Sequence, residues 1–211
     1  MKEYKLPIGC DVPETIILAD GDFPSHPLAL EWLRQCPFVV LCDGAANTYI
    51  RSGRMPEAIV GDGDSLLPDI KERYASLIHS EAEQETNDLS KAFRFCLSQE
   101  RKRITIMGAT GKREDHTIGN VSLLADYMEQ AEVSMMTDYG IFVPIREDSM
   151  FESYIGQQIS VFNMNSTALS AEGLAYPLSV FTNWWQGTLN EALARHFIIR
   201  TEGKVLVFRV F

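Results

Sequence analysis

The sequence predicts an α/β protein in which a parallel sheet with helices on both faces is followed by a smaller C-terminal antiparallel β-sandwich. Continuous apolar runs alternate with segments of helical periodicity over the first two thirds of the 211 residues. That alternation is typical of parallel strands joined by helical crossovers. After residue 139 the pattern changes to short segments of strand composition between glycines and prolines. The change predicts a second domain, built from antiparallel strands.

The elements of the first domain follow from run length and periodicity. Five short apolar runs, several of them rich in β-branched residues, predict strands at 15–20, 38–43, 57–62, 104–109 and 132–138. Three longer segments carry their apolar side chains at helical spacing and predict helices at 27–36, 87–100 and 116–130. Strands and helices in this order predict a Rossmann-like domain.

The second domain is predicted from four segments that carry strand chemistry, at 157–165, 168–176, 194–201 and 204–210. The sequence TEGK, residues 201–204, predicts a hairpin turn between the last two of them. No helical pattern recurs after residue 139. We place the boundary between Tyr139 and Gly140, which divides the chain into residues 1–139 and 140–211.

The composition excludes several classes of protein. The chain is 45% hydrophobic and 23% charged, which excludes a disordered or collagen-like protein. Its net charge of −10 argues against a nucleic-acid partner, because phosphate backbones bind basic surfaces. No apolar stretch approaches the roughly 20 residues of a membrane helix, and residues 1–15 lack a secretory apolar region, so we expect no membrane partner and a cytoplasmic location. Four cysteines without a CxxC pair predict reduced thiols rather than a zinc site.

Carboxylates follow three of the predicted strands. Each strand ends in an Asp-Gly pair, with Asp20, Asp43 or Asp62 as the acid. Any one pair alone is compatible with a simple turn. The carboxyl ends of parallel strands share one edge of a sheet, however, and ligands bind there. Carboxylates gathered at such an edge repel one another unless a cation lies between them, so the pattern favours a cation site.

The segment GDGDS, residues 61–65, is the most specific part of this pattern. Asp62 and Asp64 are separated by one residue, so both side chains can reach one ion. Mg²⁺ is usually held by one or two carboxylates together with substrate phosphates and water. Asp88, at the start of a predicted helix, is either a further carboxylate ligand, the N-cap of the helix, or an acid stabilised by the helix dipole.

A glycine-containing loop, MGATGKREDHT at 107–117, lies between a predicted strand and a predicted helix. Its backbone N–H groups, with Lys112 and Arg113, suit a polyphosphate, although the two cations are also compatible with a solvated surface. The loop is not a P-loop, because only two residues separate its glycines and Arg113 follows the lysine. GDGDSL likewise lacks the third glycine of a dinucleotide fingerprint.

Five segments in order resemble thiamine pyrophosphokinase: DGAAN (43–47), GDGDS (61–65), EQETNDLSKA (83–92), GATGKREDHTIGN (108–120) and EGLAYPL (172–178). The resemblance implies an enzyme that transfers pyrophosphate from ATP to the hydroxyl of thiamine with Mg²⁺, giving thiamine diphosphate and AMP. It implies that residues 1–139 form the nucleotide- and metal-binding catalytic domain and that 140–211 form the thiamine-binding domain. It also implies a homodimer, with the thiamine site between subunits.

The same resemblance assigns individual residues. Asp62, Asp64 and Asp88 fall on the metal-binding acids, and Arg113 and Asp115 complete the expected catalytic set. Two residues, Ser170 and Tyr176, fall near thiamine contacts, although Tyr176 is equally compatible with a place in the core. The remaining residues expected to bind nucleotide or substrate are Asp43, Asn47, Gln84, Gly108, Thr110, Gly111 and Lys112.

Some positions depart from the family pattern. Gly63 stands where an aromatic residue is usual, Asn87 replaces a threonine, Lys112 replaces a glycine, and Leu189 replaces a serine. No role follows for the pair Trp184 and Trp185, which fit the core, a dimer interface or a wall of the thiamine pocket. Two alternative functions stay open. One is another Mg²⁺-dependent nucleotide-using transferase, and the other is a protein that binds nucleotide or thiamine without turnover.

Overall fold

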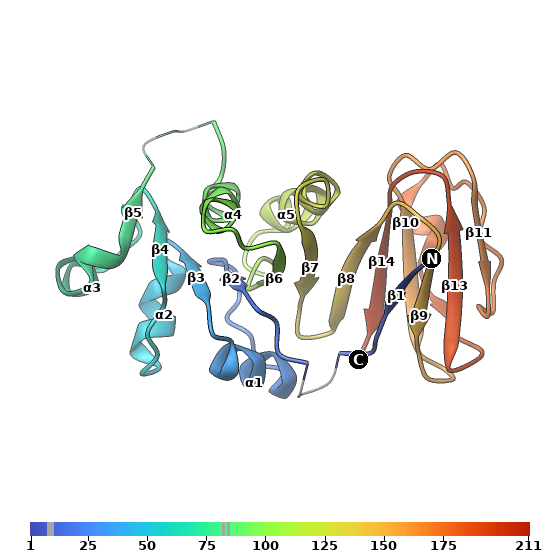
Figure 1. Ribbon diagram of the computed structural model, residues 1–211, viewed down its shortest axis with the longest axis horizontal. Helices are drawn as coiled ribbons and strands as arrows, with labels where there is room; N and C mark the ends of the chain where they lie inside the picture. Colours follow the sequence, from blue (N-terminus) through green and yellow to red (C-terminus); the bar gives the residue numbers. More distant parts are fainter. Residues whose placement is uncertain (8–10, 82, 84) are drawn as a thin grey trace. The chain divides into compact units, whose positions relative to one another are not determined.

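The structure is a computed structural model that describes residues 1–7, 11–81, 83 and 85–211. The chain forms a mixed α/β protein with two compact units (Figure 1). One unit, Gly9–Asp138, contains the helices α1–α5 and is called the α/β unit below. The other, called the β unit, combines Met1–Ile8 with Tyr139–Phe211.

Six strands of the α/β unit pair in the order β7-β6-β2-β3-β4-β5. Their bounds are β2 Ile16–Leu18, β3 Val39–Cys42, β4 Ala58–Gly61, β5 Ile78–Ser80, β6 Arg103–Met107 and β7 Glu132–Met136. All five neighbouring pairs are parallel. Strands β2, β3 and β4 are buried along their whole length, which agrees with their continuous apolar sequences.

Helices cover both faces of this sheet, with α1 and α2 on one side and α4 and α5 on the other (Figure 1). The helices are α1 Pro27–Gln35, α2 Ala45–Arg51, α3 Pro68–Arg73, α4 Asp88–Ser98 and α5 Glu114–Tyr127, with a 3₁₀ turn, η1, at Ala75–Leu77. Helices α1, α4 and α5 confirm the predicted ones. Helices α2 and α3 and strand β5 were not predicted, because segments of seven, six and three residues are too short to show a period. None of the helices in the described part of the chain is long and apolar enough to cross a membrane.

The order of the strands reverses beside β2. Strands β3, β4 and β5 follow on one side of it, whereas β6 and β7 lie on the other. Beyond the ends of β2 and β6 the two loops stay in contact, because Gly21 N donates to Gly108 O (2.6 Å) and Asp22 N to Thr110 O (2.9 Å). A Cβ on Gly21 would lie 2.3 Å from Thr110 O, so only glycine fits there. This reversal point is where open α/β sheets bind ligands.

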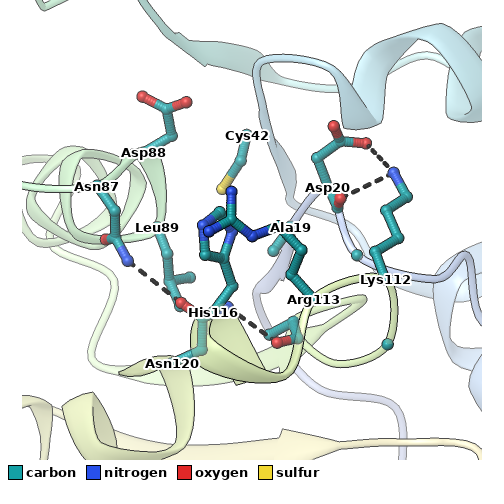
Figure 2. A pocket seen from close by; sticks show the side chains of 13 residues that line it. Ala19, Asp20, Cys42, Asn87, Asp88, Leu89, Lys112, Arg113, His116 and Asn120 are labelled. Atoms are coloured by element: carbon teal, nitrogen blue, oxygen red, sulfur yellow. Dashed lines mark hydrogen bonds and ion pairs between the residues drawn. The ribbon is translucent and has the colours of Figure 1, made fainter. Parts of the chain in front are cut away.

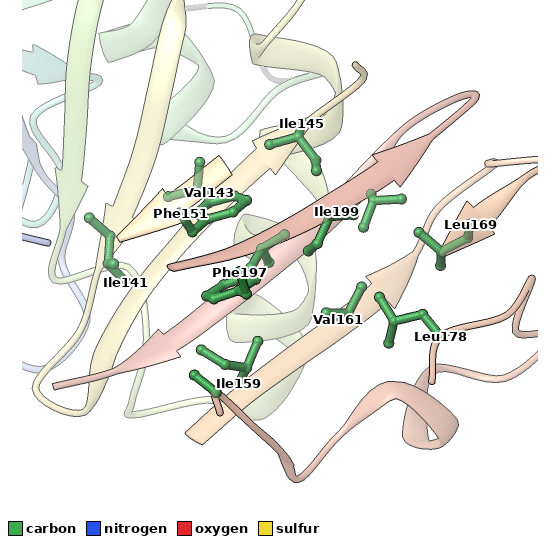
Figure 3. Packing of buried hydrophobic residues seen from close by; sticks show 13 residues of the cluster. Ile141, Val143, Ile145, Phe151, Ile159, Val161, Leu169, Leu178, Phe197 and Ile199 are labelled. Carbon is green, nitrogen blue, oxygen red and sulfur yellow. The ribbon is translucent and has the colours of Figure 1, made fainter. Parts of the chain in front are cut away.

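The β unit has two groups of strands that share one core. The first pairs in the order β1-β9-β13-β11 and the second in the order β12-β10-β14-β8. The bounds are β1 Lys2–Tyr4, β8 Gly140–Ile145, β9 Ser149–Glu152, β10 Gln158–Asn163, β11 Leu169–Glu172, β12 Asn190–Glu191, β13 His196–Thr201 and β14 Val205–Val210. A 3₁₀ turn, η2, spans Trp184–Gly187. Figure 3 shows side chains of both groups, among them Phe151, Phe197, Ile159 and Val161, packed together.

The predicted hairpin at residues 201–204 is wrong. The segment does connect β13 to β14, but β13 pairs with β9 and β11, whereas β14 pairs with β8 and β10. The turn therefore carries the chain from one group of strands to the other. Turn residues such as Gly203 (φ +130°) favour a reversal of the chain, but they do not determine which strands pair across it. Both strands turn apolar residues into the common core instead.

Candidate functional site

Three carboxylates meet at the carboxyl edge of the sheet in the α/β unit. Oxygens of Asp43, Asp62 and Asp64 all lie within 4.8 Å of one another. Asp43 directly follows β3, and Asp62 directly follows β4. The parallel pairing of these strands therefore brings together acids that are far apart in the sequence, as the pattern of strand ends predicts.

Asp43 is the most unusual member of this group. Its backbone has φ +21°, which is rare outside glycine, and only 3% of the residue is exposed. Ser65 N donates to Asp43 Oδ2 (3.1 Å), while Oδ1 is buried with no hydrogen-bond partner among the described residues. Burial, reinforced by the neighbouring carboxyl groups of Asp88, Asp64 and Asp62, raises the pKa of Asp43 to about 6. A simple turn explains none of these features, whereas a bound cation would satisfy Oδ1 and favour the ionised acid.

The loop that carries Asp62 and Asp64 is held from both sides. Asp64 N donates to Asp62 Oδ1 (3.1 Å), which tightens the turn around Gly63 (φ +77°). Lys71 Nζ donates to Gly63 O (2.9 Å) from helix α3. The Asn47 amide fixes the far end of the loop, where its Nδ2 donates to Ser65 O (2.8 Å) and its Oδ1 accepts from Leu67 N (3.0 Å). The direct role of Asn47 is thus to position the loop.

Asp88 stands apart from the group of three acids. It is the first residue of α4, and the cap is Asn87, whose Oδ1 accepts from Ser90 N (2.9 Å). The interpretation of Asp88 itself as the N-cap is therefore wrong. Its carboxylate pairs with Lys91 Nζ (3.1 Å), and the Lys91 side chain is only 4% exposed. A buried ammonium and a half-exposed carboxylate thus lie side by side at the start of α4.

A pocket of about 350 Å³ lies where the strand order reverses. Its wall is formed by the ends of β2 and β3, the loop after β6 and the first turns of α4 and α5. Figure 2 shows the Lys112 side chain reaching toward Asp20, with Asn87, Asp88 and Asn120 on the opposite side. Acids and bases therefore both face this space, which suits an anionic ligand accompanied by a cation.

The glycine-containing loop lines one side of the pocket. Gly108 (φ +63°), Gly111 (φ +78°) and Lys112 (φ +54°) all adopt left-handed backbone conformations. The carbonyls of Gly108 and Thr110 accept from the loop after β2, as described above. Asn120 Nδ2 donates to Ala109 O (2.8 Å) from helix α5. The loop is thus held by its neighbours on both sides.

The two cations of this loop are both engaged in ion pairs. Lys112 Nζ donates to Asp20 Oδ1 (3.0 Å) and to the Asp20 carbonyl (2.9 Å). Arg113 donates to both carboxylate oxygens of Asp115, at 3.0 and 2.6 Å. The guanidinium of Arg113 lowers the pKa of Asp115 to about 2. Both pairs are exposed, so their partners can be exchanged for a ligand.

Two models of known protein families match the chain. The family model described as "Thiamin pyrophosphokinase, catalytic domain" matches residues 29–136. The one described as "Thiamin pyrophosphokinase, substrate-binding domain" matches residues 140–208. The chain belongs to the thiamine pyrophosphokinase family. This membership confirms the resemblance on which the residue assignments were based.

Two thiamine pyrophosphokinases illustrate the similarity in sequence. Thiamine pyrophosphokinase 1 of Oryza sativa subsp. japonica is 31% identical over 104 residues, which are 44% of this chain and 39% of the rice protein. Thiamine pyrophosphokinase of Bacillus subtilis is 34% identical over 86 residues, which are 39% of this chain and 40% of the bacterial protein. The chain thus spans about two fifths of the length of each of these relatives.

Solved structures of thiamine pyrophosphokinases share the fold. The enzyme from Candida albicans matches with a TM-score of 0.81 at 18% identity, over 100% of this chain and 93% of that one. The enzyme from Bacillus subtilis matches with a TM-score of 0.77 at 21% identity, over 93% of this chain and 98% of that one. These matches confirm a mixed α/β protein with C-terminal β strands.

The residues that the thiamine pyrophosphokinase pattern assigns to thiamine lie in the β unit. Ser170 is exposed on β11, and Tyr176 is 64% exposed, so the alternative place for Tyr176 in the core is excluded. The buried Asn190 fixes the Tyr176 backbone, because its Oδ1 accepts from Tyr176 N (3.0 Å) and its Nδ2 donates to Tyr176 O (2.8 Å). Trp184 and Trp185 are 45% and 73% exposed, which also excludes the core for them. Gln84 lies outside the described residues.

Several residues of the site were missed from the sequence. Asp20 was noted only as a strand end, although it pairs with Lys112 92 positions away. Lys71 was not noted, and Asn120 was quoted only as the end of a family segment, because their contacts are with loops from other elements. Lys91 could have been found, since a lysine three residues after Asp88 on one helix is a favourable pairing.

Proposed function

We propose that this protein is a thiamine pyrophosphokinase, which transfers pyrophosphate from ATP to the hydroxyl of thiamine and releases AMP. The observation that carries the proposal is the group formed by Asp43, Asp62 and Asp64, within reach of one cation, in a chain of this family. In this proposal residues 1–139 carry a Rossmann-like catalytic domain and residues 140–211 a thiamine-binding β-sandwich, and Met1–Ile8 of the first range pack with the β unit. The pocket at the strand reversal supports the nucleotide part of the proposal.

The acidic residues fit a magnesium site. The buried Asp43 Oδ1 lacks a hydrogen-bond partner among the described residues, and three carboxylates from the ends of β3 and β4 converge on one point. Oxygen ligands of this kind are those that Mg²⁺ prefers. We assign Asp62, Asp64 and Asp88 as the residues that would hold the ion, with Asp43 beside Asp62 and Asp64. Bound there, Mg²⁺ would neutralise charge on the triphosphate and make the β-phosphorus more electrophilic.

The pocket provides the polyphosphate side of the site. Backbone N–H groups between Gly108 and Gly111 and the guanidinium of Arg113 are assigned to the non-bridging phosphate oxygens, where fixed donors stabilise developing charge. In the structure Arg113 donates two hydrogen bonds to Asp115. Binding of the phosphates to Arg113 would break one or both of these bonds. Positioning and charge neutralisation are the main demands of this chemistry.

In the reaction the thiamine hydroxyl oxygen forms a bond to the β-phosphorus of ATP. The bond between that phosphorus and the oxygen bridging to the α-phosphate breaks, and AMP leaves with the electron pair. The hydroxyl proton passes to a nearby base or to water. Asp115 is assigned to orient the hydroxyl, and its low pKa keeps it ionised for this role.

The β unit supplies the residues for thiamine. Tyr176 has an exposed ring, and Asn190 holds the backbone of this residue in place. Ser170 has an exposed hydroxyl. We propose a homodimer with the thiamine site between subunits. Two large apolar side chains of the β unit are exposed, Trp185 at 73% and Leu189 at 77%, and such side chains support a contact surface for another subunit in this unit. The free thiols of Cys36, Cys42 and Cys96 fit the reducing cytoplasm.

One incubation separates the possible functions. The protein is mixed with ATP, Mg²⁺ and thiamine, and the products are identified by mass spectrometry. Thiamine diphosphate with one AMP per turnover is the expected result. Formation of ADP would indicate another transferase, and binding of ATP or thiamine without products would indicate a non-catalytic binding protein.

A variant tests the metal assignment. Asp62→Asn is expected to lower activity by about 100-fold or more, because even outer-shell changes at metal sites can cost that much. The fold should be retained, since Asn preserves the acceptor that the Asp64 N–H uses. Near-normal turnover by the folded variant would contradict the assignment of Asp62 as a ligand.

A further inference from the structure

Lys112 occupies a backbone conformation that disfavours it. Its φ is +54°, in the left-handed region, where a side chain with a Cβ crowds the backbone. The family pattern has glycine at this position. Gly111, the residue before it, also has positive φ. Because lysine does not stabilise the backbone at such a position, a role for Lys112 must come from its side chain.

That side chain lines one side of the pocket. It runs from the loop after β6 to the end of β2, where the ammonium contacts the carboxylate and the carbonyl of Asp20 at 3.0 and 2.9 Å (Figure 2). The Lys112 and Asp20 side chains are 54% and 49% exposed. Exposed ion pairs stabilise a protein little, so this pair does not offset the cost of the Lys112 backbone conformation. The pair is therefore weak enough to be exchanged for a better anion.

Building on the proposed function, we propose that Lys112 is an additional polyphosphate-binding residue, held ready by Asp20 and taken over by the phosphates of the bound nucleotide. A triphosphate carries several negative charges and many acceptor oxygens, so it competes well with one exposed carboxylate. Arg113, the neighbouring cation, makes a bidentate pair with Asp115, whereas Lys112 meets its carboxylate at a single oxygen. Of these two cations, Lys112 is the more readily transferred.

The competing explanation is a purely structural one, in which the Lys112–Asp20 pair only closes the loops. The two explanations differ in what Asp20→Asn does. In a structural pair, losing either partner loosens the loops and weakens ligand binding. In our proposal Asp20 competes with the nucleotide for the ammonium, so its neutralisation frees Lys112 and strengthens binding.

The test measures dissociation constants for ATP and for adenosine by calorimetry, with Mg²⁺ present throughout. Lys112→Met is expected to weaken ATP binding by about tenfold, the value of one hydrogen bond to a charged group, and to leave adenosine within about twofold. Asp20→Asn is expected to tighten ATP binding by about threefold. Lys102→Met is the control, because Lys102 is exposed at the opposite end of β6.

A second variant covers the case in which Lys112→Met folds poorly. Lys112→Gly restores the family residue and removes the backbone cost, so its melting temperature should rise while its ATP affinity falls about as far as that of Lys112→Met. ATP affinity within twofold of the parent in both Lys112 variants would overturn the proposal. So would an Asp20→Asn protein that binds ATP as weakly as Lys112→Met.

These results are distinct from a failure of the proposed function. A parent protein that binds no ATP would overturn both proposals together. Lys112 variants that bind ATP normally and still produce thiamine diphosphate and AMP would overturn only the role of Lys112.

Discussion

At the scale of single residues, Asp43 has several features that destabilise the folded protein, and it lies in the candidate metal site. It is buried, its backbone is left-handed, one of its oxygens lacks a hydrogen-bond partner among the described residues, and its pKa is raised to about 6. Each of these features disfavours the folded protein, and strain of this kind gathers at functional sites. These features are compensated when a cation binds, because ionised Asp43 then has a partner.

These features predict the effect of Asp43→Asn. The folded-state pKa is raised from 3.8 to about 6, so ionisation of Asp43 penalises the folded state. The penalty is absent below the unfolded pKa, grows as pH rises between the two values, and is complete above about pH 6. Without divalent cations, Asp43→Asn should therefore raise the melting temperature at pH 7.5 by several degrees, at about 2–4 °C per kcal/mol, and have little effect near pH 3.5.

Thermal melts with EDTA and with Mg²⁺ check this prediction. Mg²⁺ should stabilise the parent protein more than the variant, because the variant lacks one of the converging carboxylates. A variant that is less stable than the parent at pH 7.5 in EDTA would show that ionised Asp43 has a stabilising partner other than a divalent cation.

Gly63 makes a second prediction at this scale. Its φ of +77° strains any residue other than glycine, and a Cβ would lie 3.3 Å from Lys71 Nζ, which would have to shift by a few tenths of an ångström. Gly63→Ala should lower the free energy of unfolding by about 1 kcal/mol and weaken Mg²⁺ binding, because the loop holds Asp62 and Asp64. Gly53→Ala is the matched control, since Gly53 has φ +84° with nothing within 4 Å of its Cβ position.

Both glycine variants are assayed by chemical unfolding and by Mg²⁺ titration calorimetry. Gly53→Ala should lose comparable stability and keep the Mg²⁺ affinity of the parent. Equal Mg²⁺ affinity in both variants would mean that the conformation of Gly63 does not determine the geometry of the metal loop.

At the scale of elements, the first turn of α4 links the metal side of the site to the glycine-containing loop. Asn87 caps the helix through Ser90 N (2.9 Å), and its Nδ2 donates to Asn120 Oδ1 (3.2 Å). Asn120 in turn donates to Ala109 O. A chain of hydrogen bonds therefore runs from the loop after β6 through α5 to the helix that begins with Asp88.

The cap predicts how two substitutions of Asn87 differ. Asn87→Ala should lower the free energy of unfolding by about 1 kcal/mol, the usual value of an N-cap, and so lower the melting temperature by about 2–4 °C. Asn87→Thr, which restores the family residue, keeps a capping oxygen and should lose less than half of that. Equal melting temperatures for the parent and Asn87→Ala would show that the cap does not stabilise α4.

Elements also show what the sequence could predict. Acids after β3 and β4 were expected to meet because apolar runs and Asp-Gly pairs are local signals, and parallel pairing then determines the edge they share. The partner of β14 could not be read in this way, since a turn at 201–204 is compatible with a hairpin or with passage between sheets. The contact between Lys112 and Asp20 was equally hidden, because it joins loops of different strands.

At the scale of the whole molecule, the two ends of the chain belong to one unit. Strand β1 pairs in parallel with β9, and Tyr4 stacks on Phe151 with 4.8 Å between ring centroids. The buried Arg209 of β14 donates to Lys5 O (2.9 Å) and to Glu152 O (2.9 Å), and burial lowers its pKa to about 10. The N-terminal residues therefore complete the environment of a buried cation in the β unit.

Deletion of residues 1–6 tests this organisation. It removes one strand, one aromatic contact and one of the acceptors of Arg209, and a buried donor left unsatisfied costs about 1–3 kcal/mol. Amide hydrogen exchange should accelerate in β9 and β13, while β2, β3 and β4 of the α/β unit keep their protection and ATP still binds. Arg209→Met, which keeps an apolar stem but removes the guanidinium, should retain more protection than the deletion, because β1 stays paired with β9. Unchanged exchange in β9 after the deletion would show that β1 does not stabilise the β unit, and loss of protection in β2–β4 would show that the two units do not unfold separately.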